Sequence, residues 1–158
     1  MELFQNQIEL LDGFNEQTLD YLYNNDLYLI QNRVNERTIV GRFAIYFQQL
    51  LTCSEMRYFH LDVEYNKNHS NPKQTVNFPN GTYPDLILHK RGSNDNNICI
   101  FEFKTWWNPN TSDDIEKLKD FTRQDYDYKY GAGFSLVLNK KRQTVQKYVV
   151  KNGEVLND

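Results

Sequence analysis

The spacing of apolar residues changes from a helical to a strand period partway along this 158-residue chain, and this change constrains its fold most strongly. Over residues 35–53 apolar side chains recur about every 3.6 residues and make one stripe, formed by Val40, Phe43, Ala44, Phe47 and Leu51. Over residues 59–66 apolar and polar residues alternate, which is typical of a strand with one apolar face. The chain is therefore expected to combine an amphipathic helix with a sheet.

The other segments place this helix and strand within a longer order of elements. A further N-terminal helix is predicted at residues 15–30, and strands are predicted at 83–90 and 97–105. The turn-rich residues between these two strands favour antiparallel pairing. A helix capped by Ser112 or Asp113 ends near Arg123, and strands follow at 131–140 and 144–151. The order predicts an α/β fold with a mixed sheet, in a single domain over residues 1–158.

Charge and hydropathy limit the classes of partner. The formal net charge is −3, whereas a protein that only coats nucleic acid would be basic, so any polyanion binding must be local. Basic residues gather at 89–91 and 140–142, with Lys147 nearby. The N-terminus lacks a basic segment followed by an apolar one, and no apolar run approaches the roughly 18 residues that span a bilayer. We therefore expect a cytoplasmic protein that does not bind membranes.

Charged residues interrupt two strands that otherwise read as apolar. Alternation places Asp85 on one face of its strand, and it places Glu102 and Lys104 together on a face of the next strand. Glu36 lies at the leading edge of the helical stripe that turns toward the sheet. These three carboxylates and one lysine are predicted to converge. Because clustered carboxylates repel one another and lose hydration, a bound divalent cation or the lysine would best offset the cost.

These residues carry a resemblance to a known family. The pair Pro84-Asp85, followed by Glu102-Phe103-Lys104, is similar to the motif of the PD-(D/E)xK nuclease superfamily, and the order of helix, three strands, helix and strand is similar to that family's restriction-endonuclease-like core. The resemblance covers about residues 36–138. The longer segments "LDVEYNK", "YPDLILHKRG" and "IFEFK" also resemble those of small bacterial and phage-associated members of the superfamily.

The resemblance implies a metal-dependent nuclease that hydrolyses phosphodiester bonds, with DNA favoured over RNA. It implies that Asp85 and Glu102 bind Mg²⁺ or Mn²⁺ together with the carbonyl oxygen of Phe103 and water. Lys104 would then orient or help deprotonate the attacking water, and Glu36 would hold the same metal or a second one. The basic residues 89–91 would meet flanking phosphates.

Other interpretations stay open at this point. Each charged residue alone is also compatible with a solvated position, and the fold is compatible with a catalytically inactive module that binds a protein or nucleic-acid partner in a defence or mobile-element system. A homodimer or a partner protein is equally compatible with the sequence. Whether Glu64, Gln124 and Tyr128 belong to the site is undecided, although the last two fit a QxxxY element of some nuclease subfamilies. Trp106 and Trp107 either stack on bases or cover the end of the sheet.

Overall fold

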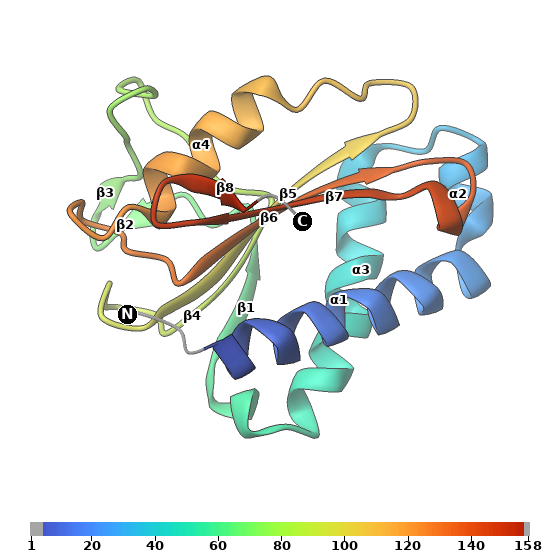
Figure 1. The fold of residues 1–158 in the computed structure, drawn as a ribbon, viewed down its shortest axis with the longest axis horizontal. Helices are drawn as coiled ribbons and strands as arrows, with labels where there is room; N and C mark the ends of the chain where they lie inside the picture. Colours follow the sequence, from blue (N-terminus) through green and yellow to red (C-terminus); the bar gives the residue numbers. More distant parts are fainter. Residues whose placement is uncertain (1–4, 157–158) are drawn as a thin grey trace.

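A computed structural model of the protein, which describes residues 5–156, has a mixed six-stranded sheet with helices on both faces (Figure 1). The helices are α1 (Gln5–Asn25), α2 (Leu27–Gln31), α3 (Glu36–Thr52) and α4 (Ser112–Thr122). The strands of the sheet are β1 (His60–Val63), β4 (Leu86–His89), β5 (Asn97–Thr105), β6 (Ala132–Leu138), β7 (Gln146–Lys151) and β8 (Glu154–Leu156). Two short strands, β2 (Lys67–Asn68) and β3 (Asn71–Pro72), form a separate hairpin. The predicted mixed α/β class is confirmed.

The strands lie in the order β1-β4-β5-β6-β7-β8. β1, β4 and β5 pair antiparallel, β6 runs parallel to β5, and β7 and β8 are again antiparallel to their neighbours. The predicted antiparallel pairing of the two charged strands is confirmed. Since β5 and β6 run in the same direction, the chain between them must cross over the sheet, and α4 makes this connection. These strand directions place the start of β4 and the C-terminal ends of β5 and β6 at the same end of the sheet.

Each face of the sheet buries its own set of apolar side chains. On one face α1 and α3 cover the strands, and Phe43 and Phe47 pack against Phe101 and Phe103 at ring-centroid distances of 4.9–6.1 Å. On the other face α4 covers Ile87 and Ile100, with its inward side chains Leu118 and Phe121. The helical period predicts that Ile115, Leu118 and either Phe121 or Thr122 point inward; Leu118, Phe121 and Thr122 are buried, and Ile115 is half-buried. The two layers hold the sheet rigidly between them.

The N-terminal helices differ from the prediction in their bounds. Ile8, Leu11 and Phe14 already follow helical spacing and are buried, so α1 begins at Gln5 rather than near residue 15. The predicted single helix over residues 15–30 is divided, because α1 ends at Asn25 and α2 begins at Leu27. None of the helices described in residues 5–156 is long and apolar enough to cross a membrane.

A hairpin at the C-terminus adds a strand that the prediction lacked. Lys151 pairs with Glu154, and the two residues between them, Asn152 and Gly153, have φ of 49° and 78°. Two successive positive φ values define the hairpin turn that Asn-Gly favours. The final predicted strand therefore corresponds to β7, and β8 returns beside it.

Candidate functional site

Asp85 and Glu102 lie side by side where β4 begins. Leu86 pairs with Phe101 in the antiparallel ladder, so the next position along sets Asp85 opposite Glu102. Ile87 and Ile100, two residues further into each strand, pair directly and belong to the apolar group under α4. The register therefore bears out the prediction that these acids share one face of the sheet, the face that α4 covers.

The backbone of Phe103 faces Asp85. The Phe103 N–H donates to Asp85 Oδ2 at 2.7 Å. This side-chain bond replaces a strand-to-strand hydrogen bond, because β4 begins only at Leu86 and offers no strand residue opposite Phe103. In an extended strand the N–H and C=O of one residue point to the same side. The Phe103 carbonyl oxygen is therefore directed to the side where Asp85 stands, and it can join the carboxylates as an oxygen ligand.

Glu102 is a buried acid with one paired oxygen. The residue is 1% exposed, and its Oε2 accepts a hydrogen bond from Lys117 Nζ at 2.9 Å. Its Oε1 is buried and has no hydrogen-bond partner among the described residues. Burial raises the pKa of the Glu102 carboxyl well above its ordinary value, and the negative charge of Asp85 raises it further. If Glu102 is ionised, only one of its two oxygens is paired with a cation among the described residues.

Lys104, also on the α4 face of β5, forms an ion pair with a buried acid of α4. Its Nζ lies 3.2 Å from Asp114 Oδ2. Burial lowers the pKa of Lys104, but the charge and hydrogen bond of Asp114, together with the charges of Glu36 and Asp85, outweigh this effect, so the pKa is raised and the cationic form is favoured. Lys117 Nζ also lies 4.0 Å from Asp114 Oδ1. Asp114 and Lys117 are site residues that the sequence prediction missed.

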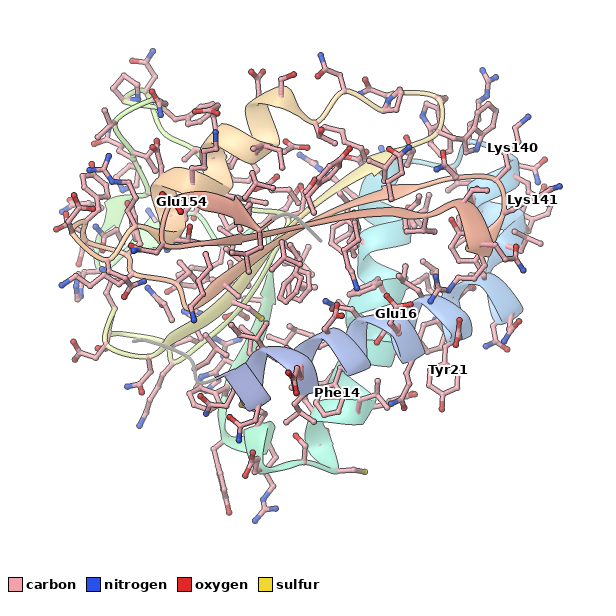
Figure 2. The ribbon with its side chains drawn as sticks, in the orientation of Figure 1. Phe14, Glu16, Tyr21, Lys140, Lys141 and Glu154 are labelled. Carbon is pink, nitrogen blue, oxygen red and sulfur yellow. The ribbon has the colours of Figure 1, made fainter. Side chains whose placement is uncertain are left out.

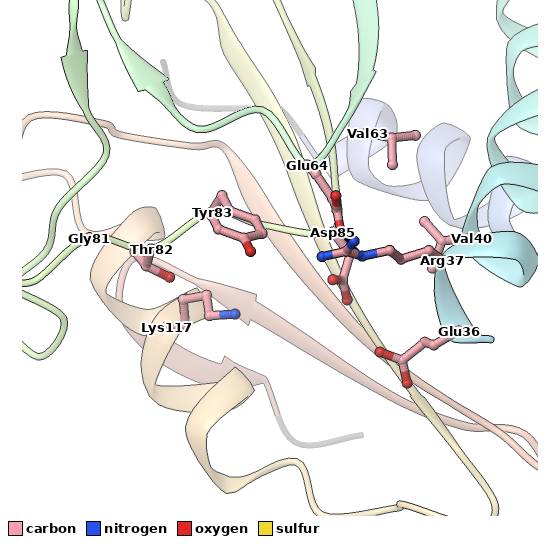
Figure 3. A pocket seen from close by; sticks show the side chains of 10 residues that line it. All are labelled: Glu36, Arg37, Val40, Val63, Glu64, Gly81, Thr82, Tyr83, Asp85 and Lys117. Atoms are coloured by element: carbon pink, nitrogen blue, oxygen red, sulfur yellow. Dashed lines mark ion pairs between the residues drawn. The ribbon is translucent and has the colours of Figure 1, made fainter.

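Glu36 and Asp85 line the same pocket, which measures about 390 Å³ (Figure 3). The side chain of Asn35 caps α3 by accepting from the Arg37 N–H at 2.9 Å, so the Glu36 carboxylate is not needed for the cap. Burial raises the pKa of Glu36, and the charge of Asp85 adds to this. Lys117 extends from α4 into the same pocket (Figure 3).

A second hollow of about 410 Å³ adjoins this pocket. The two share Thr82 and Lys117, and the second is also lined by Lys104 and Asp114. Six charged residues at this place form what we call the carboxylate–lysine cluster: Glu36, Asp85, Glu102, Asp114, Lys104 and Lys117. Five of them line the two hollows, whereas Glu102 is buried and pairs with Lys117. With every group ionised, its four carboxylates and two ammonium groups carry a net charge of −2.

The cluster's charge is what a divalent cation would neutralise. Desolvated carboxylates of net charge −2 must take up protons or a cation to be stable in a buried place. Carboxylate oxygens and a backbone carbonyl are ligands that Mg²⁺ and Mn²⁺ accept. Within residues 5–156, no group of three or more His, Cys, Asp or Glu side chains is arranged to hold a metal ion.

Several other predicted residues lie away from the cluster. His89 is at the end of β4 opposite to Asp85, and both His89 and Arg91 contact Asp62, at 2.8 Å in each case. The expectation that residues 89–91 lie near the site is therefore wrong, because β4 runs away from it. Glu64 lines the pocket but forms an ion pair with Arg37 at 2.6 Å.

Gln124 and Tyr128 form hydrogen bonds that hold the loop after α4 in place. Gln124 Nε2 donates to the carbonyl oxygens of Thr122 and Tyr130 at 2.9 and 3.2 Å. The Tyr128 hydroxyl donates to the Gln74 carbonyl at 2.9 Å, and its ring packs on Phe121. Neither residue lines the two hollows of the cluster, since the chain leaves α4 at Thr122 before reaching them.

Comparison of the chain with known protein families and with curated proteins found no match.

Proposed function

We propose that the protein is a metal-dependent nuclease that hydrolyses phosphodiester bonds of nucleic acid, with DNA favoured as the substrate. The observation that carries the proposal is that Asp85 stands opposite Glu102 in the carboxylate–lysine cluster, which has a net charge of −2 when every group is ionised and also includes Lys104. The order of elements from α3 to β6 supports it further, because this is the order that the resemblance to the PD-(D/E)xK superfamily implies.

Asp85, Glu102 and the carbonyl oxygen of Phe103 would hold Mg²⁺ or Mn²⁺, with Glu36 as a further ligand or a water-mediated one. The buried Oε1 of Glu102, which has no hydrogen-bond partner among residues 5–156, supports this assignment, since such an oxygen is stabilised by a proton or by a bound cation. When bound, the metal would supply Lewis-acid polarisation of the scissile phosphate and of water. Lys117 fixes the orientation of Glu102 through its other oxygen.

Lys104 is the residue assigned to the chemical step. Its cationic side chain is held by Asp114 at the border of the second hollow, where it can orient a water molecule and stabilise charge that develops on the phosphate. Asp114 is a positioning residue in this scheme, because it contacts Lys104 and is itself buried. The cation that orients the attacking water and stabilises charge on the phosphate would then be presented from β5, with α4 as support.

A cleavage assay tests the proposal. Plasmid, linear DNA and RNA are incubated with the protein in Mg²⁺ or Mn²⁺, and Lys104→Ala is compared with Lys119→Ala, a matched control whose exposed lysine on α4 pairs with Glu116. Lys104→Ala should lower turnover by a factor on the order of 10² while the control keeps the parent rate. Absence of cleavage with every substrate and metal, or an unimpaired Lys104→Ala variant, would contradict the proposal. Binding without cleavage would favour an inactive module instead.

A further inference from the structure

Two basic side chains that are distant in sequence meet over one indole ring. The Arg33 guanidinium carbon lies 4.5 Å from the ring centroid of Trp106, and Lys140 Nζ lies 4.1 Å from it. The ring is fixed in turn, because Trp106 Nε1 donates to the Ile30 carbonyl at 3.0 Å and Trp107 packs edge-on at 5.5 Å. Lys141 follows Lys140 and is exposed. We call Arg33, Trp106, Lys140 and Lys141 the Trp106 patch.

The basic side chains of the patch differ from their basic neighbours in their ion pairing. Within the part of the chain that the structure describes, none of the three basic side chains takes part in an ion pair, although neighbours such as Arg37 and Arg142 are paired with carboxylates. All three side chains are exposed. A contact with the face of an indole orders a cation without neutralising its charge. In a protein of net charge −3, the patch is thus a local surface of uncompensated positive charge.

The patch adjoins the carboxylate–lysine cluster along the chain and in the fold. Trp106 follows Lys104 by two residues, a distance of about 7 Å along an extended strand. Arg33 precedes Glu36 by three residues, and Lys140 comes just after β6, whose end lies beside that of β5. Figure 2 places Lys140 and Lys141 at the same end of the molecule as α2. Both sites therefore lie at the same end of the sheet, where β5 and β6 end.

We propose that the Trp106 patch binds backbone phosphates of the nucleic acid beside the bond that the proposed nuclease cuts. The inference rests on the proposed function and specifies where its polymeric substrate is held. Guanidinium and ammonium groups are the side chains that contact phosphate oxygens most favourably, and ordering them beforehand on the indole lowers the entropy lost on binding. Because the contacts reach phosphates rather than base edges, the patch gives affinity without sequence preference.

The test measures binding of labelled duplex and single-stranded oligonucleotides by fluorescence anisotropy over a range of salt concentrations, with Ca²⁺ in place of Mg²⁺ to suppress turnover. Arg33→Ala, Lys140→Ala and Lys141→Ala are each compared with the parent. The control is Lys90→Ala, which removes an exposed lysine beyond the far end of β4. Each patch variant should weaken binding several-fold and reduce the magnitude of the salt slope by about 1, while the control changes neither.

The outcomes separate this inference from the proposed function. Patch variants that keep the parent salt slope, or a parent protein that binds neither oligonucleotide, would overturn the inference even if cleavage is observed. Reduced slopes in a protein that never cleaves would support the patch and contradict the nuclease. Polyglutamate is the third probe: if it competes with the oligonucleotides and loses affinity equally in the patch variants, the surface recognises acidic polymers in general and the assignment to nucleic acid is wrong.

Discussion

Replacing Glu102 by glutamine separates the charge of this side chain from its shape. The side chain is 1% exposed, and a glutamine oxygen can still accept the hydrogen bond from Lys117. Without metal, Glu102→Gln replaces a buried carboxyl group whose ionised form is disfavoured, so the variant should unfold at the parent temperature or above it. With metal, it loses an anionic ligand and should bind the cation more weakly.

The size of the effect follows from linkage. At a Mn²⁺ concentration 100 times the dissociation constant, the parent gains about 2.7 kcal/mol of unfolding free energy. For a domain of this length such a gain raises the unfolding temperature by about 5–10 °C. If the substitution raises the dissociation constant about 100-fold, the same concentration contributes only about 0.4 kcal/mol, or roughly 1 °C.

Scanning calorimetry with and without Mn²⁺ measures these shifts, and the salt of a monovalent cation at equal ionic strength corrects for screening. Glu116→Gln is the matched control, since this acid is exposed on α4 and pairs only with Lys119 among the interactions described. The control should keep the full shift of the parent. Equal Mn²⁺ shifts in the parent and in Glu102→Gln, or no shift in the parent, would show that Glu102 is not a metal ligand.

Three further predictions concern the same cluster. Glu36→Ala should leave the unfolding temperature nearly unchanged, because Asn35 caps α3, but should lower the cleavage rate; a large loss of stability with intact cleavage would make it a structural acid. Lys117→Met leaves a buried carboxylate unpaired and should cost about 3–5 kcal/mol in urea unfolding when Glu102 is ionised. Because burial raises the pKa of Glu102, the loss should become smaller as pH is lowered and Glu102 takes up a proton; a loss that does not change with pH would contradict this. Because burial raises the pKa values of Asp85 and Glu102, the folded state holds protons more tightly than the unfolded state. The metal-free protein should therefore lose stability as pH rises above about 5, and urea unfolding across this range would refute the argument if stability rose instead.

The sequence sufficed to place Asp85 and Glu102 on one face because two local rules act together there. Alternation along each strand assigns the face, and a short turn-rich connection makes the strands antiparallel neighbours. Their register is then fixed by the apolar pairs under α4, such as Ile87 with Ile100. Glu36 could be placed because the apolar stripe of α3 defines which side of the helix meets the protein.

Alternation failed where the backbone leaves the strand conformation. It predicted Tyr65 on the side of Leu61, but Glu64 has φ of 50° and ends β1. Tyr65 consequently packs with the apolar group under α4, whereas Leu61 packs with the group under α3. A positive φ is uncommon at a residue other than glycine, and the periodicity of the sequence does not predict it. In this conformation the Glu64 carboxylate forms its ion pair with Arg37.

The positions of Lys117 and Asp114 could not be predicted from local sequence patterns, for a different reason. Both flank the inward stripe of α4, where the helical period leaves open whether a side chain lies over the sheet or in solvent. The answer depends on how closely α4 approaches β6, and Gly133 permits that approach, since a Cβ there would lie 3.1 Å from Leu118 Cδ2.

The charges themselves carry information about that packing. Glu102 and Lys104 stand two residues apart on β5, and the facing helix offers the opposite charges in Lys117 and Asp114, three residues apart. Each sheet charge thus meets its complement, and a displacement of α4 that exchanged the helix partners would oppose like charges in a place of low dielectric constant. The same two ion pairs therefore favour one position of α4 on the sheet. In this position Lys117 contacts Glu102 Oε2, while Glu102 Oε1 and the Asp85 carboxylate form no ion pair with either lysine.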